Sequence, residues 1–543
     1  MDRMRINRLL KAALPFIILL AVYLALCAVY TKNIDHWINS DTASDLVMSR
    51  LLADEKKLIS DSWYYSSELH VIKTQLVTVP LFMLTNNWHT VRIVSAYILF
   101  AILLLSYLYM CSELRIPAPL WALGALLLLP FSQIYFEFVL MGCYYIPYLS
   151  VAFLSVGLLF QSSRENRSPR RILLLSAGCL IALFSGMGGP RQLLMLYLPL
   201  CLAGLITAGP LPKIKGFGAL PAALKDSARL RFTAGAALFF LCCCIGYAFN
   251  MTVLSRIYSF SAWDEMSFQP FTFQSLQNIC NGFLTTFGFR ARGVFSKALI
   301  MNLSCGAICL FALLSAVNGL KNRSEEEAPN RFLAVFFLAS LTIFLLLYLF
   351  TDVAYEARYN ISILVFAFPL SARNLRQLFM GDLLRRAAAA AAAAVVLAAC
   401  VLNYGVIVRQ DKTKYLREIS AYLAENGFSG GYATYWNGNV LTELTNGAVE
   451  IWVWCDSTRT KKIINLESVD VVYEWLQKKS HSETHPEGKI FLVLSRQEYD
   501  LFPWKNRLHS EQKAFSTSDG SYFVYAYQDY AALCAALYGA ETP

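Results

Sequence analysis

The sequence predicts a polytopic α-helical membrane protein followed by a C-terminal α/β domain outside the membrane. Of its 543 residues, 57% are hydrophobic and only 15% are charged, a balance that soluble globular proteins do not show. Apolar runs long enough to cross about 30 Å of hydrocarbon recur from near the N-terminus to Val408. After Val408 charged residues become frequent and no run could span a bilayer. We therefore expect a transmembrane domain at 1–408 and a soluble domain at 409–543.

The apolar runs predict about eleven membrane-spanning helices. The chain begins with the basic segment MDRMRINRLLK and has no small-residue cleavage site after it, so we interpret the first run as a retained helix with a cytoplasmic N-terminus. Because eleven is odd, the C-terminal domain is expected to be extracytoplasmic, on a plasma-membrane protein. The predicted spans are 12–30, 91–110, 118–136, 143–161, 172–188, 190–207, 233–254, 298–319, 332–350, 360–373 and 387–408.

The loops predicted to face the cytoplasm carry most of the basic residues, as the positive-inside rule requires. The net charge of +10 is explained in this way by topology and by attraction to anionic lipid head groups, and it gives no reason to invoke nucleic acid. These basic residues are Arg164, Arg167, Arg170, Arg171, Lys213, Lys215, Lys225, Arg229, Arg231, Lys321, Arg323, Arg331, Arg373, Arg376, Arg385 and Arg386.

The fourteen cysteines do not form a disulfide or metal pattern, because most lie in or beside apolar spans, where a thiol behaves as a small hydrophobe. Only Cys280, Cys455 and Cys534 fall clearly in predicted outer segments. A bridge between Cys455 and Cys534 is expected only if the compartment oxidises thiols.

The segment after Val408 predicts an α/β domain. TKYLREISAYLAENG has helical spacing that ends at Gly427, and four segments rich in β-branched and aromatic residues predict strands. These segments are EIWVWC, VDVVYEWLQ, KIFLVLS and YFVYAY. No glycine pattern typical of nucleotide binding is present in the domain.

The first outer loop, at about 31–90, opens with the acidic segment IDHWINSDTASDLVMSR. Asn39 or Ser40 can cap a surface helix that starts near Asp41 and places Asp41 and Asp45 on one face at i, i+4. Two close carboxylates repel each other, which raises one pKa toward a value useful for proton abstraction unless a cation or a divalent metal relieves them. An ordinary solvated helix face is the alternative. The opposite, apolar stripe comprises Ala43, Leu46, Val47 and Leu51.

Later in the same loop, the aromatic residues 63–65 are followed by Glu68, His70 and Lys73. Aromatic planes mixed with hydrogen-bonding groups favour sugar binding, and they equally favour an aromatic belt at the membrane interface. No second histidine lies at ligand spacing from His70, so a histidine metal site is not indicated.

Two arginines in predicted outer segments are candidates for binding an anion. Arg191 follows the segment GMGG, and Arg358 lies in YEARYN. A guanidinium is always charged and its planar fork suits phosphate oxygens, so buried arginines on this side fit a lipid-linked phosphate. Glu356 could instead form a structural ion pair with either of them. The glycines at 186–189 would allow close approach of a ligand, or only break the helix before Pro190.

This arrangement resembles the GT-C superfamily of glycosyltransferases. The first loop, SDTASDLVMSRLLADEKKLISDSWYYSSELHVIKTQLVTVPLF, looks like the family's first loop, with an acid near its start. YEARYN is similar to the Arg-Tyr pair, here Arg358 and Tyr359, that many members place before a late helix, and SGMGGPRQLL to their arginine-bearing segment. YATYWNGNVLTELTNG resembles a stretch found in bacterial membrane proteins of this type. Asp41 is followed by Thr42 and not by a second acid, and no Lys-Pro-Pro follows Tyr65, so Asp41 and Asp45 both stay candidates for the base.

The resemblance implies an inverting transfer of a sugar from a polyprenyl-phosphate carrier to a glycan, lipid or protein acceptor on the outer face. Asp41 or Asp45 would take the acceptor proton, while Arg358, with Arg191 or Lys73, would stabilise the leaving phosphate. Glu68 and His70 would orient a sugar. Trp436 in the C-terminal domain would be either a surface on which the acceptor stacks or a core tryptophan.

Two other classes of function remain open from the sequence. A polymerase or ligase of surface polysaccharide would also place arginines and a histidine outside, but its essential outer loop is expected late in the chain. A transporter or flippase of lipid-linked glycans should show inverted repeats with broken helices at the bilayer midplane, and neither a repeat nor a central charge cluster is apparent.

Overall fold

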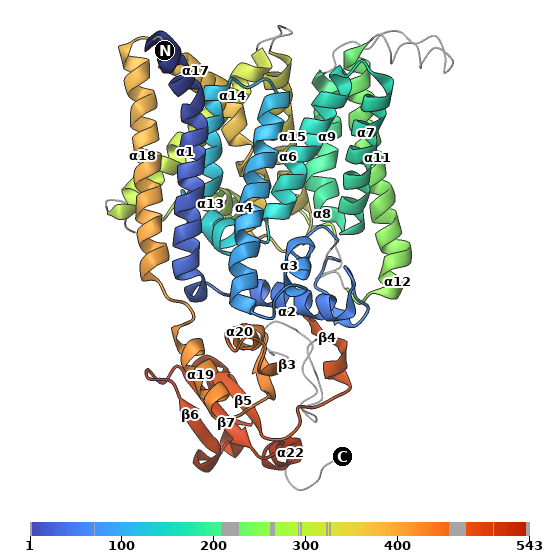
Figure 1. The fold of residues 1–543 in the computed structure, drawn as a ribbon, viewed down its shortest axis with the longest axis vertical. Coiled ribbons are helices and arrows are strands. Elements are labelled where there is room, and N and C mark those ends of the chain that lie inside the picture. Colours follow the sequence, from blue (N-terminus) through green and yellow to red (C-terminus); the bar gives the residue numbers. More distant parts are fainter. Residues whose placement is uncertain are drawn as a thin grey trace.

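The computed structural model describes residues 3–69, 71–207, 227–260, 267–291, 293, 296–321, 324, 327–454, 474–502 and 504–538. It has a helical bundle, a layer of short helices below it, and a C-terminal domain that packs against this layer (Figure 1). We call the end of the bundle nearest that domain the domain side, and the other end the opposite side. His70 and Cys455 lie outside the described residues, so the Cys455–Cys534 bridge stays a prediction.

Nine helices in the described residues are long and apolar enough to cross a membrane. The pair Ala118–Leu128 and Gln133–Met141, bent by 81° at a short break, makes a tenth span if it is counted as one. The sequence-based prediction of a multi-pass membrane protein is therefore confirmed, and ten of the eleven predicted spans have a counterpart. The bent pair begins just after Pro117 and breaks around Pro130, because proline cannot continue a regular helix.

The segment 360–373 differs from the prediction, because it does not form a single apolar helix. It forms α16 (Ile361–Leu364) and α17 (Ala367–Phe379), and α17 carries two arginines. The segment nevertheless extends between the two ends of the bundle. Arg358, just before it, contacts Asp41 on the domain side, while Arg373 forms an ion pair with Glu327 beside the start of α15 on the opposite side.

Apart from the helix at 273–286, which no predicted run covers, the remaining helices of the bundle follow the predicted runs within a few residues. They are α1 (Arg3–Asn33), α4 (Trp88–Glu113), η2 (Ala118–Leu128), α5 (Gln133–Tyr135), η3 (Phe136–Met141), α6 (Ile146–Arg164), α7 (Ser168–Met187), α8 (Pro190–Gln192), η4 (Leu193–Tyr197), α9 (Leu198–Thr207), α11 (Ala228–Phe249), η6 (Asn250–Leu254), α12 (Ser255–Ile257), α13 (Phe273–Thr286), α14 (Lys297–Lys321), α15 (Ala328–Phe350), η7 (Ala357–Asn360) and α18 (Leu383–Arg409).

Helices α7 and α11 are in direct backbone contact, which explains one glycine of the GMGG segment. A Cβ atom added to Gly186 would lie 2.0 Å from the carbonyl oxygen of Cys243, and one added to Gly246 would lie equally close to that of Leu183. Small residues allow such close approach in the absence of a hydrophobic driving force between membrane helices. Gly186 therefore serves helix packing, and among the three glycines of the GMGG segment only Gly189, with a φ of 132°, adopts a backbone conformation that favours glycine.

The first loop forms the layer between the bundle and the C-terminal domain (Figure 1). It contains η1 (Ile34–His36), α2 (Ser40–Glu55), β1 (Trp63–Tyr64) and α3 (Gln75–Phe82). The predicted surface helix is confirmed in α2. The side chain of Asn39 accepts from the amide of Thr42, and the hydroxyl of Thr42 accepts from the amide of Asn39. This reciprocal capping fixes where α2 begins, and so fixes the position of Asp41 in its first turn.

The C-terminal domain is a five-stranded sheet with helices, in the order β3-β2-β5-β7-β6. Strands β3, β2 and β5 are parallel to one another, β7 is antiparallel to β5, and the edge strand β6 is antiparallel to β7. The predicted helix at 413–427 and three of the four predicted strands are confirmed, and the fourth lies mostly outside the described residues. The elements are α19 (Lys414–Glu425), β2 (Gly430–Thr434), α20 (Gly438–Leu444), β3 (Glu450–Trp454), β4 (Gln477–Lys478), η8 (Lys479–Ser482), β5 (Ile490–Ser495), α21 (Arg496–Leu501), η9 (Lys505–Arg507), η10 (Ser510–Gln512), β6 (Lys513–Ser516), β7 (Tyr522–Tyr527) and α22 (Tyr530–Tyr538).

Buried polar contacts dock α20 of this domain against α2 and α4. Arg92 donates from Nε and Nη2 to the two carboxylate oxygens of Glu443, both at 2.5 Å, and also to the carbonyl of Thr42 at 3.0 Å. The side chains of Arg92 and Glu443 are only 9% and 4% exposed. The amide of Asn439 donates to the hydroxyl of Ser44. The domain is therefore held in one orientation over α2.

Candidate active site

Three distant parts of the chain meet at Asp41. Its Oδ2 accepts from Nη1 of Arg358 at 3.3 Å, and its Oδ1 accepts from the hydroxyl of Tyr435 at 2.6 Å. Arg358 belongs to η7, before the last two passes of the chain, and Tyr435 follows β2 of the C-terminal domain. The side chain of Asp41 is 37% exposed and that of Arg358 is 27% exposed, so both remain open to a ligand. The structure thus places the predicted acid and one predicted arginine side by side.

Tyr435 is a permanent hydrogen-bond donor to Asp41. Burial raises the pKa of Tyr435 well above its ordinary value, and the negative charge of Asp41 raises it further. The phenol therefore stays protonated over the physiological range. Sequence reasoning did not select Tyr435, because nothing in the pattern YATYW shows that Tyr435, the first residue after β2, contacts Asp41 of α2.

Asp45 lies on the same helix as Asp41 but has a different environment. Its Oδ2 accepts from the hydroxyl of Thr74 at 3.1 Å, at the start of α3. Burial raises the pKa of Asp45, with a smaller contribution from Asp41, while Lys73, Thr74 and Arg92 act in the opposite direction. The repulsion predicted between the two carboxylates is present, but desolvation is the larger cause.

The buried carboxyl of Asp45 predicts a pH dependence of stability. Because its pKa is raised in the folded state, the folded protein holds this proton more tightly than the unfolded chain does. Stability from this group is therefore full at low pH and is lost as the pH rises through the raised pKa. Asp45→Asn is expected to make the thermal midpoint less dependent on pH between about pH 4 and neutrality. The measurement is the thermal midpoint of unfolding in detergent at a series of pH values in this range. The same dependence of the midpoint on pH in the wild type and in Asp45→Asn would contradict the prediction.

Glu68 and Arg191 form a second charged pair beside Asp41's site. Nε of Arg191 lies 2.7 Å from Oε1 of Glu68, and the hydroxyl of Tyr148 donates to Oε2 at 2.7 Å. Burial alone would raise the pKa of Glu68, but the charges of Arg191 and Lys73 outweigh it and lower the pKa. Lys73 also lies 5.5 Å from the ring centre of Tyr148. Glu68 and Arg191 line a pocket with a free volume of only about 20 Å³, so in this conformation there is no room for a sugar between them and the neighbouring residues.

An aromatic cluster joins the two arginines. The guanidinium of Arg191 lies 5.1 Å from the ring centre of Tyr359, and that of Arg358 lies 5.9 Å from the same ring. Arg191 also lies over Tyr145 and Tyr148, and Arg358 over Phe138. Cation–π contacts of this kind hold a guanidinium in place without neutralising it. The signal that sequence reasoning passed over is the run CYYIPY at 143–148, which is also typical of an interfacial belt.

For two of the predicted site residues that the structure describes, one of the alternative interpretations does not hold. Glu356 is exposed, and among the described residues no ion pair joins it to either arginine, so the predicted alternative of a Glu356 ion pair is wrong. Trp436 is 40% exposed, so its interpretation as a core tryptophan is also wrong, although its carbonyl accepts from Ser40 next to Asp41. His70 lies outside the described residues, and its role stays a prediction.

A divalent metal bound by Asp41 and Asp45 would reduce the predicted repulsion between these two carboxylates. Within the described part of the chain, no three His, Cys, Asp or Glu side chains gather in a way that could hold a metal ion. The neighbours of Asp41 are a guanidinium and a phenol, which donate hydrogen bonds to it and do not complete a set of metal ligands. The described side chains around Asp41 therefore do not make up a set of metal ligands.

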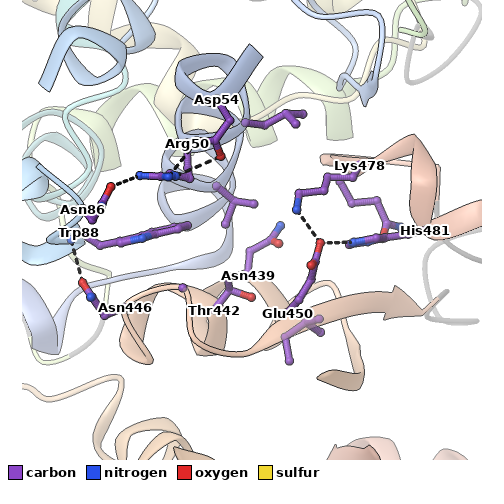
Figure 2. Close-up of a pocket in the computed structure, with 15 residues that line it drawn as sticks. Arg50, Asp54, Asn86, Trp88, Asn439, Thr442, Asn446, Glu450, Lys478 and His481 are labelled. Atoms are coloured by element: carbon purple, nitrogen blue, oxygen red, sulfur yellow. Dashed lines mark hydrogen bonds and ion pairs between the residues drawn. The ribbon is translucent and has the colours of Figure 1, made fainter. Parts of the chain in front are cut away.

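A second cavity, of about 360 Å³, lies between α2 and the C-terminal domain. Figure 2 shows Arg50 and Asp54 of α2 on one wall, with Glu450, Lys478 and His481 of the domain opposite. Arg50 is paired with Asp54 at 2.8 Å, and Lys478 with Glu450 at 2.6 Å. The hydrogen bond from His481 is the largest of the causes that lower the pKa of Glu450 to about 2. The cavity is thus polar but its charges are internally balanced.

No protein-family model matches the sequence, and no curated protein matches it either. Among solved structures, the chain is similar to the crystal structure of the oligosaccharyltransferase of Archaeoglobus fulgidus in complex with zinc and sulfate. The two share 12% sequence identity with a TM-score of 0.46, over 93% of this chain and 72% of that chain.

Proposed function

We propose that this protein is a membrane glycosyltransferase of GT-C type that transfers a sugar from a polyprenyl-phosphate carrier to a hydroxyl of a glycan, lipid or protein acceptor. The observation that supports this most is the convergence on Asp41 of Arg358 and Tyr435, from segments that are far apart in the sequence. A carboxylate and a guanidinium that are both partly exposed, at the edge of an apolar bundle, suit an acceptor hydroxyl and a lipid phosphate respectively.

The chemical step needs one base and one anion-binding group. In the proposed reaction Asp41 takes the proton of the acceptor hydroxyl while the oxygen of that hydroxyl forms a bond to the anomeric carbon of the donor sugar. The bond from that carbon to the phosphate oxygen breaks on the other face, which inverts the configuration and releases polyprenyl phosphate. Tyr435 and Arg358 hold the carboxylate in position before the substrates bind.

The phosphate gains negative charge as the bond breaks, and Arg358 is assigned to stabilise it. Arg191 has a different assignment, because its ion pair with Glu68 is closed. It positions the ring of Tyr359, which lies between the two arginines, and it holds Glu68 where the sugar hydroxyls of the donor would pass. Lys73 lies in the same pocket and adds positive charge.

The cavity of Figure 2 is assigned to the acceptor. Arg50 lies about 14 Å from Asp41 along α2, at 1.5 Å per residue, which is a reach of two to three sugar units or a short peptide. The balanced polar groups that line this cavity suit hydroxyls and amides of an acceptor better than they suit a charged group.

The proposed topology follows the basic loops. The opposite side, with its many arginines, is assigned to the cytoplasm, and the domain side to the outer face of the plasma membrane. The chemistry is then extracytoplasmic, where lipid-phosphate sugars and not nucleotide sugars supply the energy.

Membranes that contain the protein, incubated with a panel of radiolabelled polyprenyl-phosphate sugars, test the function. Label should leave the lipid fraction for an acceptor in the presence of the protein and not with the Asp41→Asn variant. Label that crosses the membrane but stays on the lipid would instead indicate a transporter, and label that is never mobilised with any sugar would contradict the proposal.

Arg358→Lys is expected to raise the concentration of lipid donor needed for half-maximal rate by about tenfold, because a lysine keeps the charge but loses the planar fork. The measurement is the rate as a function of donor concentration. Arg256, which lies on α12 and has no ion pair among the described residues, offers a matched Arg→Lys control that should leave this concentration unchanged. An unchanged donor dependence in Arg358→Lys would argue against phosphate contact.

A further inference from the structure

A large cavity lies at the opposite side of the bundle, about as far as the fold allows from Asp41. Its volume is about 1,210 Å³, and it is bounded by the ends of α4, α6, α9, α11, α15, α17 and α18. Figure 1 shows these helix ends at the top of the view, away from the C-terminal domain. The proposed function makes no use of this cavity.

Seven of the described residues that line the cavity are arginines, and none of them is an aspartate or a glutamate. Arg115, Arg164, Arg229 and Arg331 come from four different helix ends. Arg373, Arg376 and Arg385 come from α17 and the start of α18. Like charges around one space repel each other, and an anion bound among these arginines would relieve that repulsion.

The nearest described carboxylates compensate only part of this charge. Glu327 forms an ion pair with Arg373, Asp382 lies 3.8 Å from Arg385, and Glu113 lies close enough to Arg115 and Arg164 to interact with them electrostatically. Arg115 and Arg376 are exposed and form no ion pair with any described residue. Their guanidinium groups therefore remain available to phosphate oxygens.

Apolar surface adjoins the arginines. Phe160, Phe232 and Phe332 line the cavity and contact one another edge to face, with ring centres 4.8–5.3 Å apart. At the rim, Met380 is 70% exposed, and Leu383 just beyond it is 84% exposed. A soluble phosphate ion would use only the arginines, whereas a phospholipid would use both surfaces, with its headgroup among the cations and its acyl chains along the apolar side chains.

We propose that this cavity binds the headgroup of an anionic phospholipid from the leaflet opposite to the active site. The site is structural or regulatory, and it is independent of whether the domain side carries out sugar transfer. A lipid with two phosphates uses more of the arginines than one with a single phosphate, so it should bind more tightly.

Native mass spectrometry of the full-length protein in detergent, titrated with tetraoleoyl cardiolipin, dioleoyl phosphatidylglycerol or dioleoyl phosphatidylcholine, tests this. The variant Arg115→Gln with Arg376→Gln is compared with the variant Arg167→Gln with Arg171→Gln. Both remove two positive charges from the same side of the bundle, but the second pair does not line the cavity. This control therefore separates a built site from general attraction of anionic lipid to a basic face.

We expect the cavity variant to bind the first cardiolipin at least about tenfold more weakly than the wild type does. The control variant should bind it as tightly as the wild type. Phosphatidylcholine should bind all three alike. Equal losses in both variants, or no preference of the wild type for anionic lipid, would overturn the proposal. Full displacement of the lipid by millimolar inorganic phosphate would also overturn it, because the cavity would then be a site for a free anion.

Discussion

Replacement of Asp41 by Asn is expected to lower the rate of sugar transfer by at least about a hundredfold, because a general base contributes about 10² to 10⁴ to a rate. The amide keeps the size of the side chain and can still accept from Tyr435, so insertion and folding should not change. The measurement is the initial rate of label transfer at matched amounts of protein in the membrane. A pH–rate profile should show the loss at every pH at which the wild type is active.

Asp45→Asn is the matched control, one helical turn away on the same face of α2. Its carboxyl accepts from Thr74 and has no described ion pair with Arg358, so the rate should stay within about threefold of the wild type. Full activity in Asp41→Asn together with a large loss in Asp45→Asn would transfer the role of base to Asp45. Full activity in both would remove the carboxylate from the mechanism altogether.

Replacement of Arg92 by Leu is expected to give the largest effect on stability. It leaves Glu443 buried without its cation, and breaking one partner of a buried pair costs about 3–5 kcal/mol. The contact of Arg92 with the carbonyl of Thr42 is lost as well, so the C-terminal domain should separate from α2. Increased proteolysis of the connection at residues 410–413, and faster hydrogen exchange in α20, measure that separation.

Arg50→Ala provides the comparison for an exposed pair. Arg50 and Asp54 are 31% and 56% exposed, and such surface pairs contribute at most about 1 kcal/mol. The double variant Arg92→Leu with Glu443→Leu should recover most of the loss, because no charge is left buried. A single Arg92→Leu variant that resists protease as well as Arg50→Ala would show that the pair does not hold the domain.

The sequence predicted the class of fold because hydrophobic length and basic loops are properties of local segments. The helix at Asp41 was predictable for the same reason, since capping by Asn39 and Thr42 involves only neighbours in sequence. The predicted span at 360–373 was partly wrong because the helix is broken between Leu364 and Ala367, and because the second helix continues to Phe379 with two arginines, Arg373 and Arg376, that line the cavity on the opposite side.

The composition of the site was only partly predictable. Asp41, Arg191 and Arg358 stand out in the sequence, because they lie next to membrane spans in predicted outer segments, where an ionisable residue is a candidate for function. Which of these residues contact each other could not be predicted, since Arg358 contacts Asp41 and Arg191 contacts Glu68 across segments that no local rule relates. Tyr435 could not be predicted from its surroundings, because its position depends on how the sheet of the C-terminal domain docks on α2.

The contacts of Asp41 also determine when in biosynthesis the site can form. Its partners Arg358 and Tyr435 lie 317 and 394 residues later in the chain, so Asp41 leaves the ribosome long before either of them. The site cannot exist until the last helix has been inserted and the C-terminal domain has folded on the nascent protein. A truncated translation product would therefore insert into the membrane but lack the assembled candidate site.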